Sequence, residues 1–256
     1  MRKNVYLCNV KTNTQTAMRK IALMLLLPLA AMLFSSCGAW YYAKPVDAPL
    51  LEGKGDFRAS ASLSTIDILP GAVNASLSYG FTDHLGGQLF GAWYNEGEYY
   101  SHVALGYYTD FGDHFVMEIF GGAGLGSSMN AAARNPENLD EDYNSAVWFD
   151  YKQLFGQLDL GWHSLPFLNT DIGVGLRGGI MPYTLNVTDR EGKPLYDNEK
   201  GTLPLFEPVA FLRFGFENVK FQLSLAYSSV DLYRETLHNQ VNCSPFSVSA
   251  GISLNL

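Results

Sequence analysis

The feature that most constrains this chain is an alternation of apolar and polar residues that recurs from Phe57 to the last residue. Between Ala72 and Phe81, the residues Val, Ala, Leu, Tyr and Phe occupy every second position, and Asn, Ser and Gly fill most of the positions between them. The stretch from Phe246 to Leu256 repeats the pattern. Successive side chains of a β-strand point to opposite faces, so each stretch predicts a strand with one apolar and one polar face.

The alternation predicts ten strands. They are expected at residues 57–66, 72–81, 85–95, 101–110, 115–126, 149–162, 169–187, 206–216, 219–230 and 246–256. Most of them are 10 to 14 residues long. This exceeds the usual strand length of soluble proteins and matches the roughly 9–11 residues of a tilted strand that crosses a membrane. A change of phase near Pro182 predicts a bulge there, or the end of the strand above a membrane, because Pro disrupts ladder pairing.

The links between the predicted strands are alternately short and long. Short links are expected at 82–84, 111–114, 163–168 and 217–218, and longer ones at 67–71, 95–100, 127–148, 188–205 and 231–245. In an up-and-down sheet, the short links all lie at one end. Outer-membrane barrels have this asymmetry, with short periplasmic turns and longer external loops. We therefore expect an all-β fold, an antiparallel up-and-down transmembrane β-barrel of about ten strands, with both termini on the periplasmic side.

The composition decides which face of the predicted barrel points inward. Charged residues make up 16% of the chain, and the polar face consists mainly of Ser, Gly, Asn and Gln. Such small side chains make a poor water-exposed surface but can fill a narrow lumen. Aromatic residues cluster near strand ends, as membrane girdles do. These observations favour an apolar face toward lipid over the alternative of a soluble barrel with an apolar, ligand-binding lumen.

The few charges within the predicted strands lie on the polar face. Because a charge facing lipid at mid-depth costs about 2–4 kcal/mol, we expect them in the lumen. One interpretation is a pore lining or a catalytic cluster. We favour a paired ionic network that closes a narrow barrel, since few strands enclose little space. The residues of this network are Arg58, Glu118, Asp159, Arg177, Arg213 and Lys220.

The start of the chain predicts export. Residues 1–17 are polar and unpatterned and are interpreted as an extension of the gene model before a start at Met18. Arg19 and Lys20 then precede an apolar run of 14 residues, Ile21 to Phe34, which is too short to span a membrane as a helix and is typical of a signal peptide. Small residues followed by Cys37 resemble the lipobox of bacterial lipoproteins, although Phe34 stands where Leu is preferred.

This lipobox implies a signal peptide over 18–36, acylation of Cys37, a periplasmic linker over 37–56 and a barrel over 57–256. More than one acyl chain would anchor the protein stably.

The chain as a whole resembles small outer-membrane β-barrels of Bacteroidota that carry a lipobox. Residues 249–256 match the C-terminal signal of that class, although the usual last residue is Phe and here it is Leu256. The stretch Pro49–Phe57 resembles the segment that precedes the first strand of those proteins. The resemblance implies residence in the cell outer membrane, contact with its lipid and recognition of the last strand by the barrel assembly machinery. It implies no defined activity.

No motif predicts catalysis, a metal or a cofactor. The acidic run Asp140–Asp142 has no His-x-Asp pair beside it, as in outer-membrane proteases, and His163 is followed directly by Ser164, whereas outer-membrane lipid hydrolases have His-x-Ser. The five His and three Cys form no metal-binding spacing. A net charge of −8 gives no support to nucleic-acid binding, which usually needs a basic surface.

We therefore expect a non-enzymatic protein with a structural or surface-interaction role. The alternatives are a small porin-like channel and a soluble, lipid-anchored periplasmic barrel. Charged residues in the long loops are candidates for binding a partner, or are simply water-exposed surface. They are Asp140, Glu141, Asp142, Asp189, Arg190, Glu191, Lys193, Glu199, Lys200 and Arg234.

Overall fold

The computed structural model describes residues 41–66, 69–94, 98–112, 114–131, 146–188, 191–233, 235–238, 241 and 243–256. The extension over 1–17, the signal peptide over 18–36 and the acylation of Cys37 fall outside the described residues and stay predictions. Of the charged loop residues, Asp140–Asp142, Asp189, Arg190 and Arg234 fall outside as well. Within the described residues, no helix is long and apolar enough to cross a membrane.

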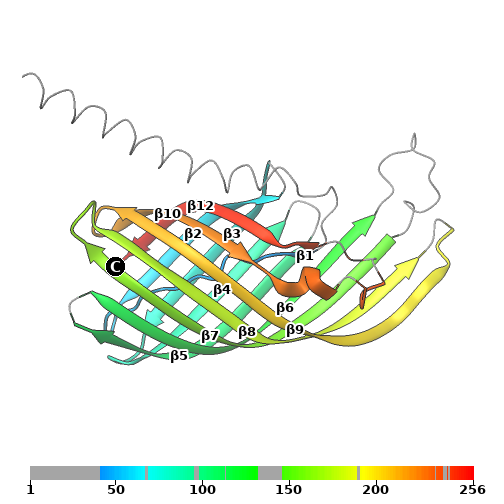
Figure 1. Ribbon diagram of the computed structural model, residues 1–256, viewed down its shortest axis with the longest axis horizontal. Helices are drawn as coiled ribbons and strands as arrows, with labels where there is room; N and C mark the ends of the chain where they lie inside the picture. The colour runs from blue at the N-terminus through cyan, green and yellow to red at the C-terminus, as the bar shows by residue number, and fades with distance from the viewer. Residues whose placement is uncertain are drawn as a thin grey trace, which may run out of the picture. The chain divides into compact units, whose positions relative to one another are not determined.

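Ten antiparallel strands form a closed barrel in which each strand pairs with its neighbour in sequence and the last strand pairs with the first (Figure 1). The predicted all-β, up-and-down antiparallel barrel is confirmed. The strands are β2 (Phe57–Ile66), β3 (Leu69–Gly80), β4 (Leu85–Tyr94), β5 (Tyr99–Phe111), β6 (Phe115–Ala131), β7 (Ala146–Leu165), β8 (Thr170–Thr188), β9 (Pro194–Gly215), β10 (Val219–Tyr227) and β12 (Phe246–Asn255).

Two expected loops are wrong. The link expected at 188–205 is mostly strand, because β9 begins at Pro194 and stays paired with β8 as far as Thr188. Leu203 and Leu205 on this added length are buried, so apolar packing extends the hairpin beyond the expected end. The link expected at 67–71 shrinks to residues 67 and 68, because β3 begins at Leu69. The links at that end are therefore not all long.

No bulge occurs at Pro182. The residue pairs in register with Thr202 of β9 and its side chain is exposed, so the ring points away from the lumen. Pairing with β7 is interrupted beside it, between Tyr151↔Tyr183 and Leu154↔Ile180, without a shift of register. The missing amide of Pro is therefore accommodated by a gap in the ladder.

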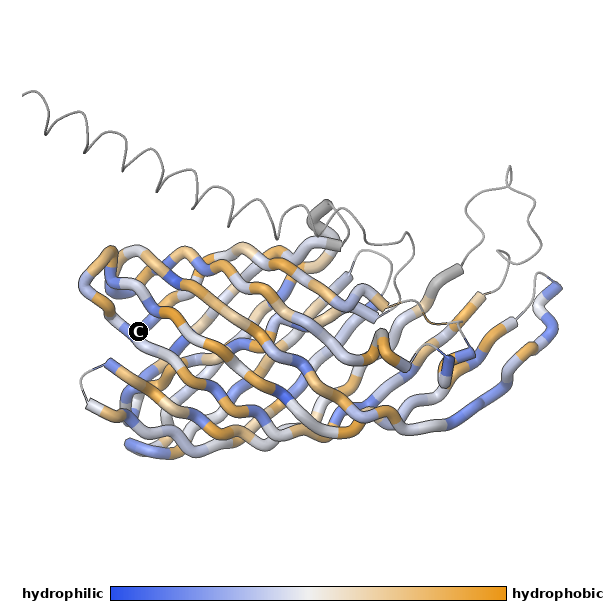
Figure 2. The backbone as a smooth tube through the Cα atoms, in the orientation of Figure 1, coloured by the Kyte–Doolittle hydropathy of each residue, from blue (hydrophilic) through white to orange (hydrophobic). Residues whose placement is uncertain are grey.

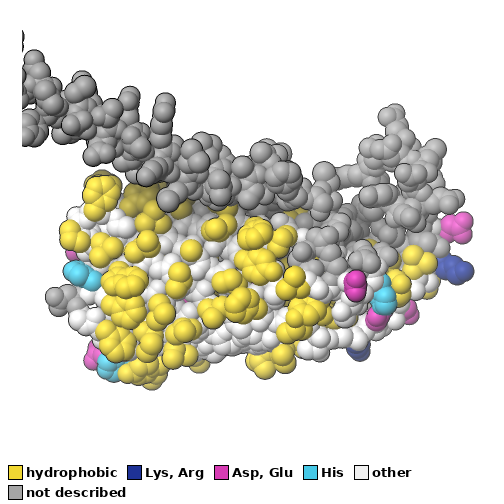
Figure 3. Space-filling model, viewed as in Figure 1, with side chains coloured by type: hydrophobic (Ala, Val, Ile, Leu, Met, Phe, Trp, Pro, Cys, Tyr) yellow, Lys and Arg dark blue, Asp and Glu magenta, His cyan; other side chains and the backbone are white. Residues whose placement is uncertain are grey.

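The apolar face of each strand points outward and the Ser- and Gly-rich face points inward, as predicted. Leu77, Leu225 and Ile252 are 46%, 41% and 47% exposed. Their neighbours Ser76, Ser224 and Ser253 are 3%, 5% and 3% exposed. Figure 2 shows the alternation along each strand, and Figure 3 shows hydrophobic side chains across the visible barrel wall with charged ones near its two ends.

At one end of the barrel, here called the short-turn end, consecutive strands are connected by residues 81–84, 112–114, 166–169 and 216–218. At the opposite, long-loop end, β7, β8 and β9 run past the other strands. Inside this extension the link between β10 and β12 supplies a 3₁₀ helix, η3 (Ser229–Tyr233), and the short strand β11 (Cys243–Ser244). An apolar cluster packs there, and it includes Tyr94, Phe149, Tyr183, Leu185, Leu203, Val230, Leu237 and Val241.

Residues 41–51 lie inside the barrel, not in a periplasmic linker. Every side chain from Tyr41 to Leu51 is buried, and the segment contacts inward-facing residues of six barrel strands, β3 to β7 and β9. Its first residues form β1 (Tyr41–Tyr42), which pairs in parallel with β11. The expectation of a linker over 37–56 is therefore wrong for residues 41–51, because this segment finds partners for its polar groups within the lumen.

Candidate functional site: a peptide plug in the barrel lumen

The site is the barrel lumen and residues 41–52 that occupy it, here called the plug. The plug runs from the long-loop end, where Tyr41 is in register with Cys243, to the short-turn end. There, Gly55 donates its amide to the Gly80 carbonyl at 2.8 Å, and Gly80 directly precedes the 81–84 turn. The chain then reverses direction into β2. The lumen is therefore filled along its length by the polypeptide that precedes the first barrel strand.

The middle of the plug is held by Asp47. Its Oδ1 lies 2.9 Å from Nη2 of Arg213 on β9, and its Oδ2 accepts a hydrogen bond from Ser76 on β3. The Asp47 carbonyl accepts bonds from Gln88 Nε2 at 2.6 Å and Gln157 Nε2 at 3.1 Å. Arg213 Nη2 also donates to the Ala48 carbonyl at 2.6 Å. One residue of the plug thus connects four strands of the wall.

Close to the short-turn end, a wall carboxylate binds the plug backbone. Glu118 on β6 accepts the amides of Leu50 and Leu51 at 2.9 and 2.8 Å. Charge-assisted hydrogen bonds of this kind are about twice as strong as neutral ones. The wall has glycines where the two leucines lie. A Cβ on Gly161 of β7 would lie 2.8 Å from Leu50 Cδ2, and one on Gly86 of β4 would lie 2.5 Å from Leu51 Cδ1. These glycines leave the space that the two leucines fill.

At the long-loop end, the ammonium of Lys44 sits among four tyrosines. Its Nζ lies 4.1, 5.0, 5.6 and 5.7 Å from the ring centroids of Tyr41, Tyr94, Tyr151 and Tyr100. The same Nζ donates to the Tyr42 carbonyl at 2.8 Å and to Glu98 Oε1 at 3.2 Å. Aromatic faces attract cations within about 6 Å, most strongly where water is excluded. This arrangement compensates the burial of the lysine.

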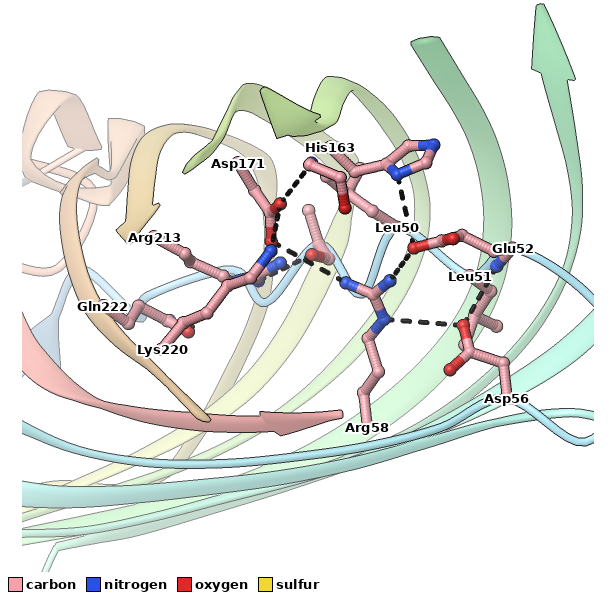
Figure 4. A network of polar contacts seen from close by, with 12 residues as sticks. Leu50, Leu51, Glu52, Asp56, Arg58, His163, Asp171, Arg213, Lys220 and Gln222 are labelled. Carbon is pink, nitrogen blue, oxygen red and sulfur yellow. Dashed lines mark hydrogen bonds and ion pairs between the residues drawn. The ribbon is translucent and has the colours of Figure 1, made fainter. Parts of the chain in front are cut away.

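The short-turn end carries a second ionic group, shown in Figure 4. Arg58 lies 2.8 Å from Glu52, 3.5 Å from Asp56 and 4.0 Å from Asp171. Lys220 Nζ lies 2.6 Å from the Asp171 carboxylate, and His163 Nδ1 lies 3.3 Å from Glu52. An ion pair between Glu52 and Arg58 thus joins the plug to the wall at this end as well.

The structure places all six predicted network residues in the lumen, each at most 5% exposed. They do not pair with one another. Arg177 contacts Glu207 at 3.7 Å, Arg213 contacts Asp47, and Arg58 and Lys220 share Asp171. Glu118 and Asp159 are register neighbours on β6 and β7. Glu118 receives the plug amides, and Asp159 accepts a bond from Gln157 at 2.7 Å.

The sequence did not single out five buried charged partners: Lys44, Asp47, Glu98, Asp171 and Glu207. Asp171 and Glu207 lie on predicted strands at inward-facing positions, so the period of two contained the signal for them. Lys44 and Asp47 precede the alternating region and were assigned to a linker, and nothing in their local sequence shows that they enter a barrel.

The described residues offer no sign of catalysis or metal binding. Among them, no group of three or more His, Cys, Asp or Glu could hold a metal ion. Of the described loop candidates, Glu199 on β9 lies 2.7 Å from His238 Nε2, and His238 stacks on Tyr196. This contact ties the link after η3 to the inner side of the β9 extension, where Tyr196 packs against the apolar cluster.

No protein-family model and no curated protein matches the sequence. The chain is similar to solved structures that include the N-terminal β-barrel domain of Pseudomonas aeruginosa OprF, at 10% identity over 80% of this chain and 99% of that chain, with a TM-score of 0.33. Ail, the attachment invasion locus protein of Yersinia pestis, is 11% identical over 80% of this chain and all of that chain, with a TM-score of 0.36. Because these TM-scores are low, the assignment of the barrel fold depends on the strand pairing of this chain and not on these similarities.

Proposed function

We propose that this chain is an outer-membrane β-barrel protein with a structural or surface-interaction role, closed by its own plug and not acting as an enzyme. The observation that carries the proposal is the contrast between the two faces of the wall. Outward side chains of the described strands carry charge only near the long-loop end, on β7 and the first half of β9. Inward side chains of the described barrel strands include eight buried Asp, Glu, Lys or Arg groups, of which six form ion pairs with one another or with Asp47 of the plug. A closed barrel satisfies its backbone internally, as lipid requires.

The outward face of β7 supports a definite membrane boundary. From Trp162 to Leu154 its outward side chains are apolar or Gly, and the next two outward positions are Lys152 and Asp150. That apolar stretch of nine residues is the length a tilted membrane strand needs, about 9–11 residues. The extension beyond Lys152 then lies in water, which supports the long-loop end as the external one.

The same face argues against a soluble lipid-anchored barrel. Large apolar side chains such as Leu89, Leu105 and Leu154 are 53%, 63% and 60% exposed. They continue around the wall, whereas soluble monomers rarely expose apolar patches above a few hundred Å². The lumen of the described barrel meanwhile holds ion pairs and the plug, which argues against a role in enclosing an apolar ligand.

The plug argues against a porin-like channel. Conduction would require the lumen to empty, and emptying it would strip Asp47 from Arg213 and two amides from Glu118. These contacts, together with the buried leucines of the plug, oppose its departure from the lumen. Acylation of Cys37, contact with outer-membrane lipid and recognition of β12 by the barrel assembly machinery complete the proposal.

Two measurements on the purified full-length protein test the proposal. We expect a folded form that migrates differently before and after boiling, extracts from membranes only with detergent, and shows no steady conductance in a planar lipid bilayer. Solubility without detergent after Cys37→Ser would contradict membrane insertion. Steady single channels from the unaltered protein would contradict closure and favour the channel.

A further inference from the structure

The two ends of the plug lie at opposite ends of the barrel. At the long-loop end, Tyr41 and Tyr42 pair in parallel with Cys243 and Ser244, and the Ala43 amide donates to the Ser244 carbonyl at 3.2 Å. At the short-turn end, the Lys54 amide donates to Asp83 in the 81–84 turn at 3.3 Å. The chain between these points therefore runs the whole length of the lumen.

The length of the plug agrees with a complete crossing. An extended chain advances about 3.3–3.6 Å per residue. The twelve residues 41–52 can thus span up to about 40 Å, which exceeds the roughly 30 Å hydrocarbon core of a bilayer. The crossing needs no hydrogen bonds with lipid, because Glu118, Gln88, Gln157 and Arg213 satisfy plug backbone groups inside the lumen.

We infer that the polypeptide preceding Tyr41 begins on the external side of the outer membrane and crosses back to the periplasmic side through the lumen. This inference rests on the proposed function for the orientation of the barrel. It makes the plug an eleventh crossing that belongs to no sheet within the membrane. It also reverses the expectation that both ends of the exported chain are periplasmic: β12 ends at the short-turn end, whereas the chain before Tyr41 starts at the other.

The position of Tyr41 limits where a lipid anchor can be. Cys37 is four residues before Tyr41 and can lie at most about 14 Å from it. This is too short to return through a core of about 30 Å. An acyl chain on Cys37 would therefore enter the outer leaflet of the membrane, beside the long loops, and the protein would present its amino-terminal end at the cell surface.

This path also constrains assembly. The lumen is crowded by Arg213, Glu118 and the leucine-glycine contacts, so an acylated end has no room to be threaded through a finished barrel. The barrel closes where β12 pairs with β2, directly after the plug in sequence. The inference therefore requires the plug to enter the lumen before the barrel is complete.

An epitope inserted between Trp40 and Tyr41 tests the inference in the full-length protein. Matched epitopes after Gly192, at the long-loop end, and after Glu217, at the short-turn end, report the orientation of the barrel. We expect antibody to bind the first two on intact cells and the third only after the outer membrane is permeabilised. Binding at 192 but not at 40 on intact cells would overturn the inference and leave the proposed function standing. Binding at 217 and not at 192 would overturn the orientation itself.

A smaller probe guards against displacement of the plug by the epitope. If the protein with the epitope after Trp40 loses its heat-modifiable migration, an Ala39→Cys variant is used in place of the epitope. This variant is labelled with a membrane-impermeant maleimide, and Lys193→Cys and Glu217→Cys are the matched controls. Labelling above that of the parent protein on intact cells at 39 and 193, but not 217, supports the inference. Labelling at 39 only after permeabilisation contradicts it.

Discussion

Asp47 Oδ1 lies 2.9 Å from Nη2 of Arg213, deep inside the barrel, and this contact joins a residue that precedes the first barrel strand to β9 in the wall. The pair is buried on both sides. It places opposite charges where neither meets bulk water, so each is costly without the other. The relationship explains why the plug stays in the lumen.

Removing the carboxylate should therefore destabilise the folded barrel. We expect Asp47→Ala to lower the free energy of unfolding by about 3–5 kcal/mol, because Arg213 is left buried without its partner. The measurement is the urea concentration at which heat-modifiable migration is lost. Glu217→Ala, at an exposed turn, should change the free energy of unfolding by less than about 0.5 kcal/mol. Equal midpoints for the two variants would show that the pair contributes nothing.

Reversing the charge should open the lumen. Asp47→Lys places a second cation beside Arg213, and like charges in a region of low dielectric repel strongly. We expect the plug to leave the lumen and single-channel conductance to appear in planar bilayers, where Asp47→Asn gives little or none. Silent bilayers with folded, inserted Asp47→Lys protein would indicate that the lumen is closed by something other than the plug.

The tyrosine cage predicts a selective effect at the long-loop end. Lys44→Met should lose the cation–π contacts and the ion pair with Glu98, a loss of about 1–3 kcal/mol, while Lys44→Arg should retain most of both. Amide hydrogen exchange at residues 41–43 should accelerate in the Met variant and stay slow within β3. Lys54→Met, the exposed lysine just past the plug, serves as the control. Unchanged exchange at 41–43 would contradict a role for the cage.

On the proposed placement in a bilayer, the outward apolar wall predicts a cost that depends on depth. Leu89→Lys places a charge among outward apolar side chains and should cost about 2–4 kcal/mol in a bilayer. Asp150→Lys, on the extension beyond Lys152, should cost close to nothing. Urea unfolding in lipid vesicles measures both. If Leu89→Lys proved as mild as Asp150→Lys, that part of the wall would face water.

The barrel could be predicted from sequence because its wall repeats one physical rule. A period of two located all ten strands, and both ends of β2 agree with the predicted strand over 57–66. A strand with one apolar and one polar face cannot slip by one position without turning its polar side outward. The ends were harder: Leu203 and Leu205 extend β9 through packing against residues far away in sequence.

The plug could not be predicted for a different reason. The side chains of the plug follow no period, because a chain inside a barrel is surrounded by the wall and is buried on every side. Lys44 and Asp47 resemble ordinary linker charges until Glu98 and Arg213 are seen beside them. The charges on the strands, Asp171 and Glu207 included, could therefore be found from the period of two, whereas the charges of the plug lie in a segment without pattern.

The most direct test of the account is a single substitution, Tyr41→Cys. Tyr41 is in register with native Cys243, and paired strands lie about 4.8 Å apart, within the range that a disulfide spans. Under mild oxidation of the folded protein, mass spectrometry should find the 41–243 peptide pair linked, whereas Tyr42→Cys, whose partner is Ser244, should give little of the corresponding link. A Tyr41→Cys protein that migrates as a folded barrel yet forms no 41–243 disulfide would contradict a plug that crosses the lumen.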